Sequence, residues 1–306
     1  MAINTLEMAK IFQQELDKQM LTAGTSGWME ANASDVKYNG GDTVRMPMIS
    51  TSGLAKYDRD DGFNQGAVTL AYKDYTLTQD RGRTFQLDSM DVDESNFVAT
   101  AGTVMGEFQR TKVAPEIDAY RYSRIAALAK GASHESAAFT PSKDNILGKL
   151  DEEITKLQDI IGEDEPLVLI MATPVRTILN GAKDVTRYLD VADFKAGAVN
   201  TKVRTYNEIP ILSVPSARMK TAYIFADGKT TGQEAGGFKA DTGAKAINWI
   251  LMARRAPIAI SKTDKVRIFE PDTNQKADAW KLDYRKFHDL WIPSNKLAGV
   301  WVNTGA

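Results

Sequence analysis

The 306-residue sequence contains no cysteine, which excludes disulfides, thiolate nucleophiles and cysteine-ligated zinc sites. It also lacks long apolar runs. The longest, at 167–172 and 249–253, are far too short to span a bilayer, and the N-terminus has no continuous apolar core typical of a signal peptide. Neither charge sign dominates: the net charge of −2 argues against the broad basic face of a dedicated nucleic-acid-binding protein, although local basic patches stay possible. With 43% hydrophobic and 25% charged residues, the composition is that of a soluble globular protein of about two domains.

Residues that could perform catalysis are scarce. His134 lies in a polar stretch, and His288 precedes Asp289 in a predicted strand, where adjacent side chains point to opposite faces and cannot form a relay. The stretch GFKADTGAK at 237–245 lacks the glycine spacing of a phosphate loop. The acidic stretch DSMDVDES at 88–95 lacks the glycine and glutamate of an EF-hand, so we interpret its acids as favourable charges at a helix N-terminus. We therefore predict no catalytic residue, no cofactor and no metal site.

The first ninety residues predict one helix followed by long polar strands. Apolar residues recur on one helical face over 5–21, a strand pattern covers 43–50, and a loop tip rich in glycine and aspartate covers 51–66. The stretch DYTLTQDRGRTFQLD at 74–88 alternates like a β-hairpin, with Gly82 taking a positive φ angle in its turn. Because a two-stranded hairpin is marginal in water, this polar hairpin needs partners from elsewhere.

The rest of the chain predicts a long helix, an α/β region and a return to strands. Apolar spacing predicts a helix over 96–130, which Pro115 should kink or interrupt. Beyond it, helical and strand patterns alternate in a compact α/β domain over about 140–245. The last sixty residues read as strands with one face buried.

Four stretches resemble the major capsid proteins of tailed bacteriophages, whose fold is named after phage Hong Kong 97. The first is DYTLTQDRGRTFQLDSMDVDES ahead of the long helix, and the second is QRTKVAPEIDAYRYSRIA within it. The others are YNEIPILSVP and the C-terminal region from INWILMARRAPIAISK to DAWKLDYRKFHDLWIPSNKLAGVWV. These stretches contain no catalytic motif. Their order and their residue patterns resemble the family across essentially the whole chain.

The resemblance implies an α+β fold with named parts. Residues 1–40 would form an N-terminal arm and 41–88 an extended β-loop. Residues 89–139 and 246–306 would form a peripheral domain with a long spine helix, and 140–245 an inserted axial α/β domain. The polar hairpin would then find its partners on neighbouring subunits.

The same resemblance implies a non-enzymatic function. The protein would assemble with itself into the hexamers and pentamers of an icosahedral shell around double-stranded phage DNA, in the virion and without a membrane, after assembly in the bacterial host cytoplasm. Met1 leads almost directly into the arm helix, which favours a separate scaffolding protein, and a portal, head-completion or decoration proteins and non-specific contact with packaged DNA are further implied partners. The alternatives are an encapsulin-like bacterial compartment shell protein and a soluble enzyme with a carboxylate pair.

Assembly contacts are predicted at three places. The loop tip contributes Tyr57 and Phe63, and Arg81 and Arg83 flank Gly82. The turn EPDTNQKADA at 270–279 contributes Glu270, Asp272 and Lys276. The type phage cross-links a loop lysine to an asparagine of a neighbour. Lys56, Lys73 and Asn303 are the candidates here, but we interpret them as ordinary surface residues.

Overall fold

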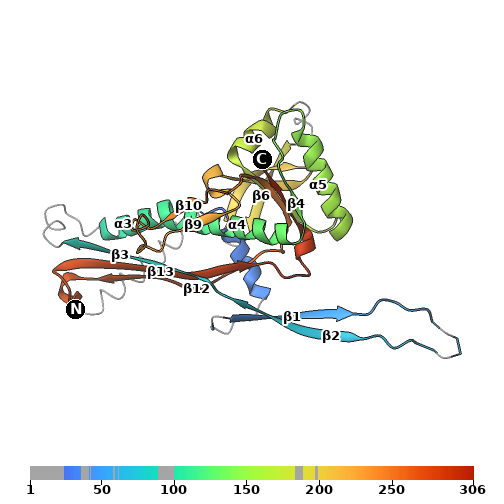
Figure 1. The fold of residues 1–306 in the computed structure, drawn as a ribbon, viewed down its shortest axis with the longest axis horizontal. Coiled ribbons are helices and arrows are strands. Elements are labelled where there is room, and N and C mark those ends of the chain that lie inside the picture. The colour runs from blue at the N-terminus through green and yellow to red at the C-terminus, as the bar shows by residue number, and fades with distance from the viewer. Residues whose placement is uncertain are drawn as a thin grey trace.

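The computed structural model describes residues 24–35, 41, 43–57, 59–60, 62–88, 100–182, 189–196 and 199–306. The described chain has three parts: a compact α/β head, a long helix lying along a three-stranded sheet, and a two-stranded ribbon that projects from the opposite end (Figure 1). This mixed architecture confirms the predicted α+β class. The predicted helix at 5–21 and most of the acidic stretch at 88–95 lie outside the described residues.

The head is built on a seven-stranded sheet. Its strands run in the order β4-β14-β11-β5-β8-β7-β6. Helices α5 (Ile146–Ile161) and α6 (Thr173–Asn180) and the end of α4 contribute apolar side chains to its core. The sheet strands are β4 (Glu135–Ser136), β5 (Leu167–Ala172), β6 (Leu189–Ala196), β7 (Val199–Tyr206), β8 (Ile209–Val214), β11 (Ile247–Ala253) and β14 (Val300–Thr304). Two short strands, β9 (Tyr223–Phe225) and β10 (Phe238–Ala240), form a separate hairpin.

Two strands of the C-terminal region lie in the head sheet. The family resemblance places all of 246–306 in the peripheral part, but β11 pairs with β5 and with β14 in the middle of the head sheet. Every residue of β11 is buried, as is every residue of β5. Because a strand that is apolar on both faces must be covered on both faces, β11 belongs at the centre of a sheet and not in a half-solvated one.

The long helix is helical throughout residues 100–131, and its α-helical pattern is perturbed near Pro115, as predicted. Helix α3 (Thr100–Phe108) leads through a π-helical turn at Gln109–Val113 into α4 (Ala114–Gly131). Pro115 stands in the first turn of α4. Since proline has no N–H to donate and its ring crowds the preceding turn, the wider π-helical turn accommodates it without ending the helix.

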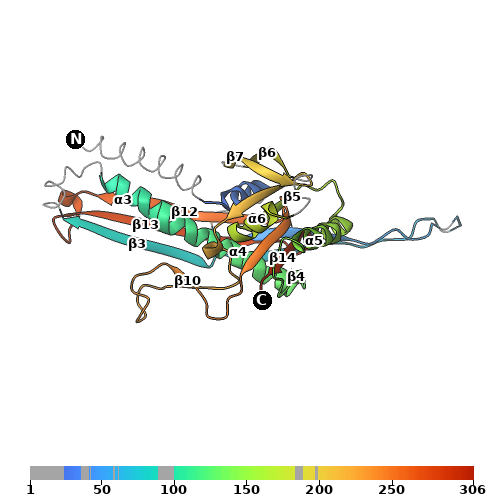
Figure 2. The ribbon, with the colours of Figure 1, turned by 90° about the horizontal axis from the view of Figure 1, so that it is seen from above.

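The three-stranded sheet runs beside this helix (Figure 2). Its order is β12-β13-β3, with β12 (Ile258–Phe269), β13 (Ala279–Trp291) and β3 (Gln79–Asp88) all antiparallel. Met105 of α3 packs with Leu282 and Tyr284 of β13, and Phe85 and Phe108 meet edge to face. One face of this sheet therefore packs against the helix through apolar side chains.

The predicted hairpin at 74–88 does not exist. Strand β2 (Val68–Thr76) pairs with β1 (Thr43–Thr51), whereas β3 pairs with β13. Gly82 is not in a turn and has no positive φ angle; it lies in β3 opposite Arg285. A Cβ atom at this position would lie 2.8 Å from the carbonyl oxygen of Tyr284. Gly82 therefore permits a close approach of two backbones, and β3 finds its partner within its own chain.

We expect Gly82→Ala to destabilise the subunit. A Cβ contact with a backbone atom at that distance forces the strands apart, and overpacking of this kind typically costs about 1–3 kcal/mol. Gly148→Ala is the matched control, because a Cβ atom added to Gly148 in α5 would have no neighbouring atom within 4 Å, and alanine should stabilise the helix slightly there. Urea unfolding of the two variants measures the difference, and equal stability of both would contradict this account of Gly82.

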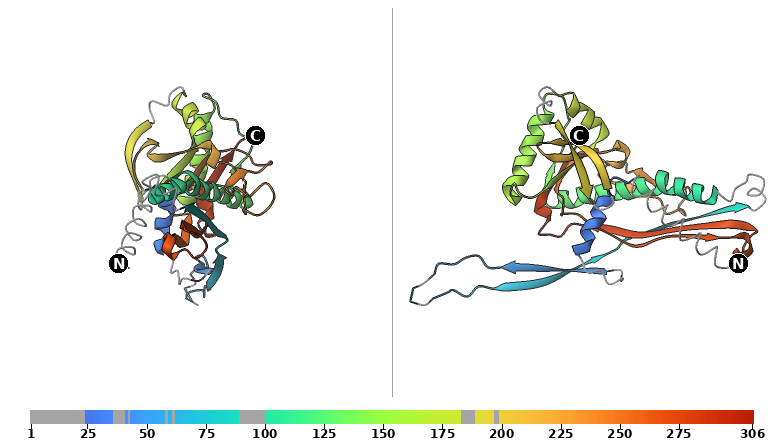
Figure 3. Two further views of the ribbon diagram at one scale, coloured as in Figure 1. Left: turned by 90° about the vertical axis from the view of Figure 1, so that its left-hand side faces the viewer. Right: turned by 180° about the vertical axis from the view of Figure 1, so that it is seen from behind.

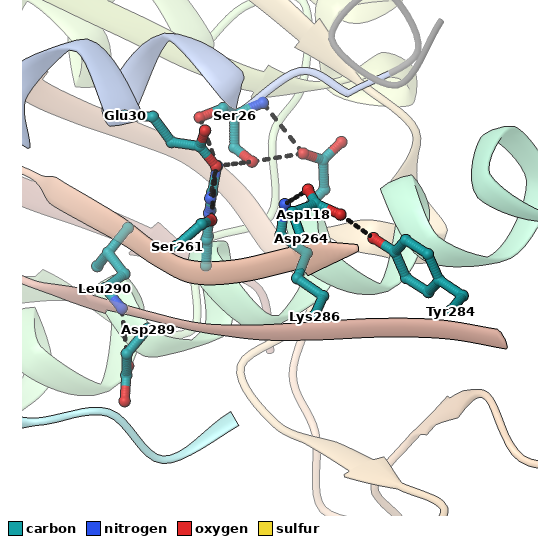
Figure 4. Close-up of polar contacts among 10 residues, drawn as sticks. Ser26, Glu30, Asp118, Ser261, Asp264, Tyr284, Lys286, Asp289 and Leu290 are labelled. Carbon is teal, nitrogen blue, oxygen red and sulfur yellow. Dashed lines mark hydrogen bonds and ion pairs between the residues drawn. The ribbon is translucent and has the colours of Figure 1, made fainter. Parts of the chain in front are cut away.

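A buried polar cluster joins the N-terminal segment to the long helix and the sheet (Figure 4). Asp118 of α4 accepts hydrogen bonds from the backbone N–H and hydroxyl groups of both Thr25 and Ser26, and from Arg218 at 2.9 Å. Arg121, also fully buried, pairs with Glu30 and donates to the carbonyl oxygen of Ser26. These contacts fix the segment Gly27–Asp35 between α4 and β12.

Candidate assembly surface

The ribbon formed by β1, β2 and the loop between them, residues 43–76, is called the arm below. It belongs to the predicted extended β-loop and is distinct from the predicted N-terminal arm at 1–40. It extends away from the rest of the molecule in Figures 1 and 2 and in the right-hand view of Figure 3. The two strands pair without interruption from Thr43↔Thr76 to Thr51↔Val68. Beyond them, Ser52 and Ala67 continue the pairing, and the side chain of Asn64 donates to the carbonyl oxygen of Lys56 at 2.6 Å. The arm is thus a hydrogen-bonded ribbon with no third strand among the described residues.

Large apolar side chains on the distal arm are exposed. Ile49 is 72% exposed and Phe63 is 90% exposed. The rings of Tyr57 and Phe63 meet edge to face at the tip, with centroids 5.0 Å apart. The exposed set in the arm is Ile49, Leu54, Tyr57, Phe63, Val68, Leu70 and Tyr72. An isolated ribbon is marginal in water, and clustered exposed apolar side chains mark surfaces that bind a protein partner.

The root of the arm, in contrast, has a small apolar core. Val44 and Met46 of β1 and Leu77, which follows β2, are buried against β12 and β13. The contacting side chains are Ile258, Ile260 and Trp291. The ring of Tyr75 lies 5.7 Å from that of Trp291. This anchor fixes where the arm leaves the body while the distal half receives no support from the described part of its own chain.

A buried carboxylate fixes the junction between the arm and β3. Asp289 accepts hydrogen bonds from the backbone N–H and the hydroxyl of Thr78 at 2.9 and 2.8 Å, and from the hydroxyl of Tyr120 at 2.6 Å. Burial and the neighbouring Asp289 carboxylate raise the pKa of Tyr120, so its hydroxyl stays a donor. Thr78 lies in the two-residue connection between β2 and β3, and this cluster ties that connection to α4.

The histidine beside this carboxylate is structural. His288 is buried, its ring packs edge-on against that of Tyr120, and its Nδ1 atom has no hydrogen-bond partner among the described residues. Burial lowers the pKa of His288 well below its usual value, and the positive charges of Arg121, Lys286 and Arg81 lower it further. Asp289 contacts Thr78 and Tyr120, so the described residues build no relay through His288.

Stability should therefore fall in weak acid. In the unfolded chain His288 has an ordinary pKa of about 6.5, so it is protonated below that pH, whereas in the folded chain it stays neutral. The unfolded state therefore binds more protons as the pH falls, and the free energy of unfolding decreases by up to about 1.4 kcal/mol per pH unit. Replacing His288 by phenylalanine should remove this slope between pH 6.5 and 5, whereas His134→Phe should retain it. Urea unfolding of unassembled protein across this pH range measures both, and an unchanged slope in the His288 variant would refute the assignment.

Arg81 and Arg83, predicted to pair with an adjacent subunit, both have partners within the chain. The Arg81 Nε atom pairs with Glu116 of α4 at 2.7 Å, and its other nitrogens donate to the carbonyl oxygens of Ala226 and Gly237. Arg83 donates to the carbonyl oxygen of Glu234. Arg81 and Arg83 alternate with Phe85 on the face of β3 that points toward the long helix. Their hydrogen bonds connect β3 to the segment that joins β9 and β10.

The remaining predicted contacts lie at two opposite ends of the molecule. Glu270, Asp272 and Lys276 lie between β12 and β13 at the far end of the long sheet, where Asp272 and Lys276 are exposed. Tyr57 and Phe63 lie in the loop between β1 and β2, and the arm that carries this loop projects at the other end of the molecule (Figures 1 and 2). The sequence prediction therefore corresponds to two separate surfaces.

Of the cross-link candidates, Asn303 is not a surface residue. It is fully buried, donates to Glu153 at 2.8 Å and accepts from Asn248 at 2.8 Å. Trp249 donates to the same Glu153 carboxylate, whose pKa burial raises. Lys73 donates to Ser294, and Lys56 is exposed in the loop of the arm. Our interpretation of Asn303 as a surface residue is wrong because β14 lies inside the head sheet.

Two further classes of site are not found in the part of the chain that the structure describes. No three histidine, aspartate or glutamate side chains converge there as metal ligands. None of the described helices has the length and apolar character needed to cross a membrane.

Solved structures from phages share this architecture. The mature capsid of bacteriophage PhiM1 matches with a TM-score of 0.59 over 88% of this chain and 83% of that chain, at 12% identity. The capsid of cyanophage P-SCSP1u matches with a TM-score of 0.55 over 87% and 84%, at 12% identity. A chain from Gordonia phage Cozz matches with a TM-score of 0.54 over 86% and 81%, at 15% identity. Neither a protein-family model nor a curated protein matches the sequence.

The chain therefore has the Hong Kong 97-type fold of phage capsid structures, as its sequence predicted. Within that fold, the distal half of the arm exposes large apolar side chains that the described part of its own chain does not cover.

Proposed function

We propose that this protein is the major capsid protein of a tailed phage and assembles with itself into the hexamers and pentamers of an icosahedral shell around double-stranded DNA. The observation that carries the proposal is the arm, a ribbon that exposes seven large apolar side chains and that a neighbouring copy would cover. A shell subunit needs no catalytic site, so we propose no enzymatic activity. Assembly in the host cytoplasm, a separate scaffolding protein, a portal, and head-completion or decoration proteins stay predictions.

Electron microscopy of the purified full-length chain tests the proposal. Closed particles of uniform size are expected, alone or with a co-expressed scaffolding protein. A persistent monomer under all these conditions would contradict it. The alternative of an encapsulin-like compartment shell is decided by the contents of the particles, because a phage head holds nucleic acid and a compartment shell holds a cargo enzyme. Hydrolase activity of a monomer would support the carboxylate-pair alternative.

The far end of the long sheet should carry contacts between capsomers. Asp272 and Lys276 are exposed beside Glu270 at the end of the β12–β13 hairpin, where opposite charges of symmetry-related copies could pair. Glu270→Lys with Asp272→Lys should leave small oligomers intact and reduce the yield of closed shells at least tenfold. Sedimentation velocity measures the two populations. A normal shell yield from the double variant would show that this turn is only a solvated hairpin end.

A further inference from the structure

His288 lies at the point where the arm, the three-stranded sheet and the long helix meet. On β13 it lies opposite Gln79, the first residue of β3. The ring of Tyr120 from α4 packs edge-on against the imidazole with the ring centroids 5.6 Å apart, and its hydroxyl donates to Asp289 at 2.6 Å. Asp289 also accepts from Thr78, the residue just before β3. A short series of contacts therefore connects the imidazole to the segment that joins the arm to the sheet.

A positive charge on this imidazole would have no partner ready for it. The three cations that act on the ring come from α4, β13 and β3 and already have carboxylate partners; the pairs are Arg121–Glu30, Lys286–Asp264 and Arg81–Glu116. Arg124, one turn along α4 from Tyr120, is exposed to water, and Asp289 is occupied by its neutral donors. The Nδ1 atom of His288 has no hydrogen-bond partner among the described residues. Since a buried charge is costly unless it is paired, a proton on His288 requires the entry of water.

Opening the junction is the least costly way to bring water to the imidazole. The root of the arm is held by the small apolar cluster described above, whereas the head core draws on α4, α5, α6 and the strands of the seven-stranded sheet. Regions with few buried apolar contacts open at a lower free energy than the body of a protein. Withdrawal of residues 77–80 removes the strand beside His288 and the hydrogen bonds of Thr78 to Asp289, and so exposes the ring to water.

The head responds to acid in the opposite sense. Glu153 of α5 is fully buried, accepts hydrogen bonds from Trp249 and Asn303, and has a pKa that burial raises. Because the folded head binds a proton at Glu153 more readily than the unfolded chain does, this group adds stability as the pH falls through the raised pKa. At the junction the sign is reversed, since burial lowers the pKa of His288. Weak acid therefore weakens the junction relative to the head.

We propose that the junction is an acid-sensitive hinge: in weak acid His288 takes up a proton, residues 77–80 leave the edge of the sheet, and the arm loses its fixed direction while the head stays folded. Hydration of the imidazolium drives the opening, and each subunit that opens binds one proton. The opening equilibrium therefore shifts by up to about tenfold per pH unit. The inference concerns a single subunit and does not depend on the proposed function.

Hydrogen exchange of the unassembled full-length chain tests the hinge. After correction for the intrinsic pH dependence of exchange, protection of the amides at 78–80 should fall roughly thirtyfold between about pH 7.5 and 5, because an exposed imidazole with a pKa of about 6.5 takes up one proton on opening. The amides of β5 and β11, which are buried throughout, should stay at least about a hundredfold more protected at the lower pH, because they lie in the stable core. Unchanged protection at 78–80, or an equal loss of protection in the head, would overturn the inference.

Replacement of each histidine assigns the response. His288→Phe should hold the protection at 78–80 constant within about threefold over the same pH range, because no proton is taken up on opening. The matched control is His134→Phe, which removes the other of the two histidines and should reproduce the fall seen in wild type. If the phenylalanine variant does not fold, His288→Gln, which does not titrate, takes its place. A fall in the His288 variant as large as that in the control would assign the response to other groups and overturn the inference.

Spin labels measure the direction of the arm itself. The chain contains no cysteine, so Thr69→Cys in the arm and Asp159→Cys in the head, both at exposed positions, carry the only labels. The distribution of distances between the labels should broaden on acidification in the doubly labelled chain, and should not change when His288→Phe is added. A distribution that does not depend on pH in the doubly labelled chain would show that the arm keeps its direction, and would overturn the inference.

Discussion

Deletion of the arm tip from Gly53 to Gly66 is expected to abolish shell assembly while leaving the subunit folded. The tip and its flanking strands expose Leu54, Phe63 and Ile49, and none of the three core clusters includes a residue of the deleted segment. The root residues Val44, Met46 and Leu77 stay in place. Because the same contact recurs in every subunit of a closed shell, its loss is multiplied over the particle, and we expect particle yield to fall at least a hundredfold.

The control for the deletion keeps the length of the arm and removes only its aromatic tip. Tyr57→Ser with Phe63→Ser should weaken assembly less than the deletion but in the same direction, since fewer apolar side chains are lost. Circular dichroism and urea unfolding of the monomer should be unchanged in both variants. Hydrogen exchange completes the test: arm amides should exchange fast in a verified monomer and slowly in particles, and strong protection in the monomer would mean that the arm packs within its own chain.

Replacement of Asp118 by alanine is expected to be the most destabilising single change. The variant would remove the carboxylate that pairs with Arg218 and that accepts four hydrogen bonds from the N–H and hydroxyl groups of Thr25 and Ser26. Breaking a buried ion pair by removing one partner typically costs about 3–5 kcal/mol. Because the carboxylate joins the N-terminal segment to α4, the loss should appear as a lower midpoint of urea unfolding and as earlier exchange of the amides in Gly27–Asp35.

Asp159→Ala is the matched control for this variant. Asp159 is an exposed acid on α5, so its replacement changes the net charge equally and should alter the free energy of unfolding by less than about 0.5 kcal/mol. Asp118→Asn, which keeps the shape and one acceptor oxygen, should lie between the two. A loss in Asp118→Ala no larger than in the control would show that the N-terminal segment is held by its apolar contacts alone.

The sequence by itself determined the elements whose signal is local. Helical and strand patterns predicted the α/β region that contains α5 and β5, strand patterns predicted the C-terminal strands, and the proline at 115 marked the place where the long helix is perturbed. Each of these signals depends on residues within one or two turns of chain, and the capsid-type fold was implied by the resemblance of four stretches of the sequence to that family. The exposed tip of the arm was also predicted, since its glycines and aspartates favour a loop wherever it lies.

Only the tertiary structure decided which strands pair and which polar side chains are buried with hydrogen-bonding partners. The alternation at 74–88 fits a hairpin as well as two separate strands, and the choice was made by β13, a strand distant in the sequence, whose backbone approaches Gly82 too closely for any side chain. In the same way Asn303 was interpreted as a surface residue, and nothing in the sequence singled out Asp118, whereas both are buried and hydrogen-bonded in the structure. Pairing between distant segments depends on mutual burial, and no local pattern records it.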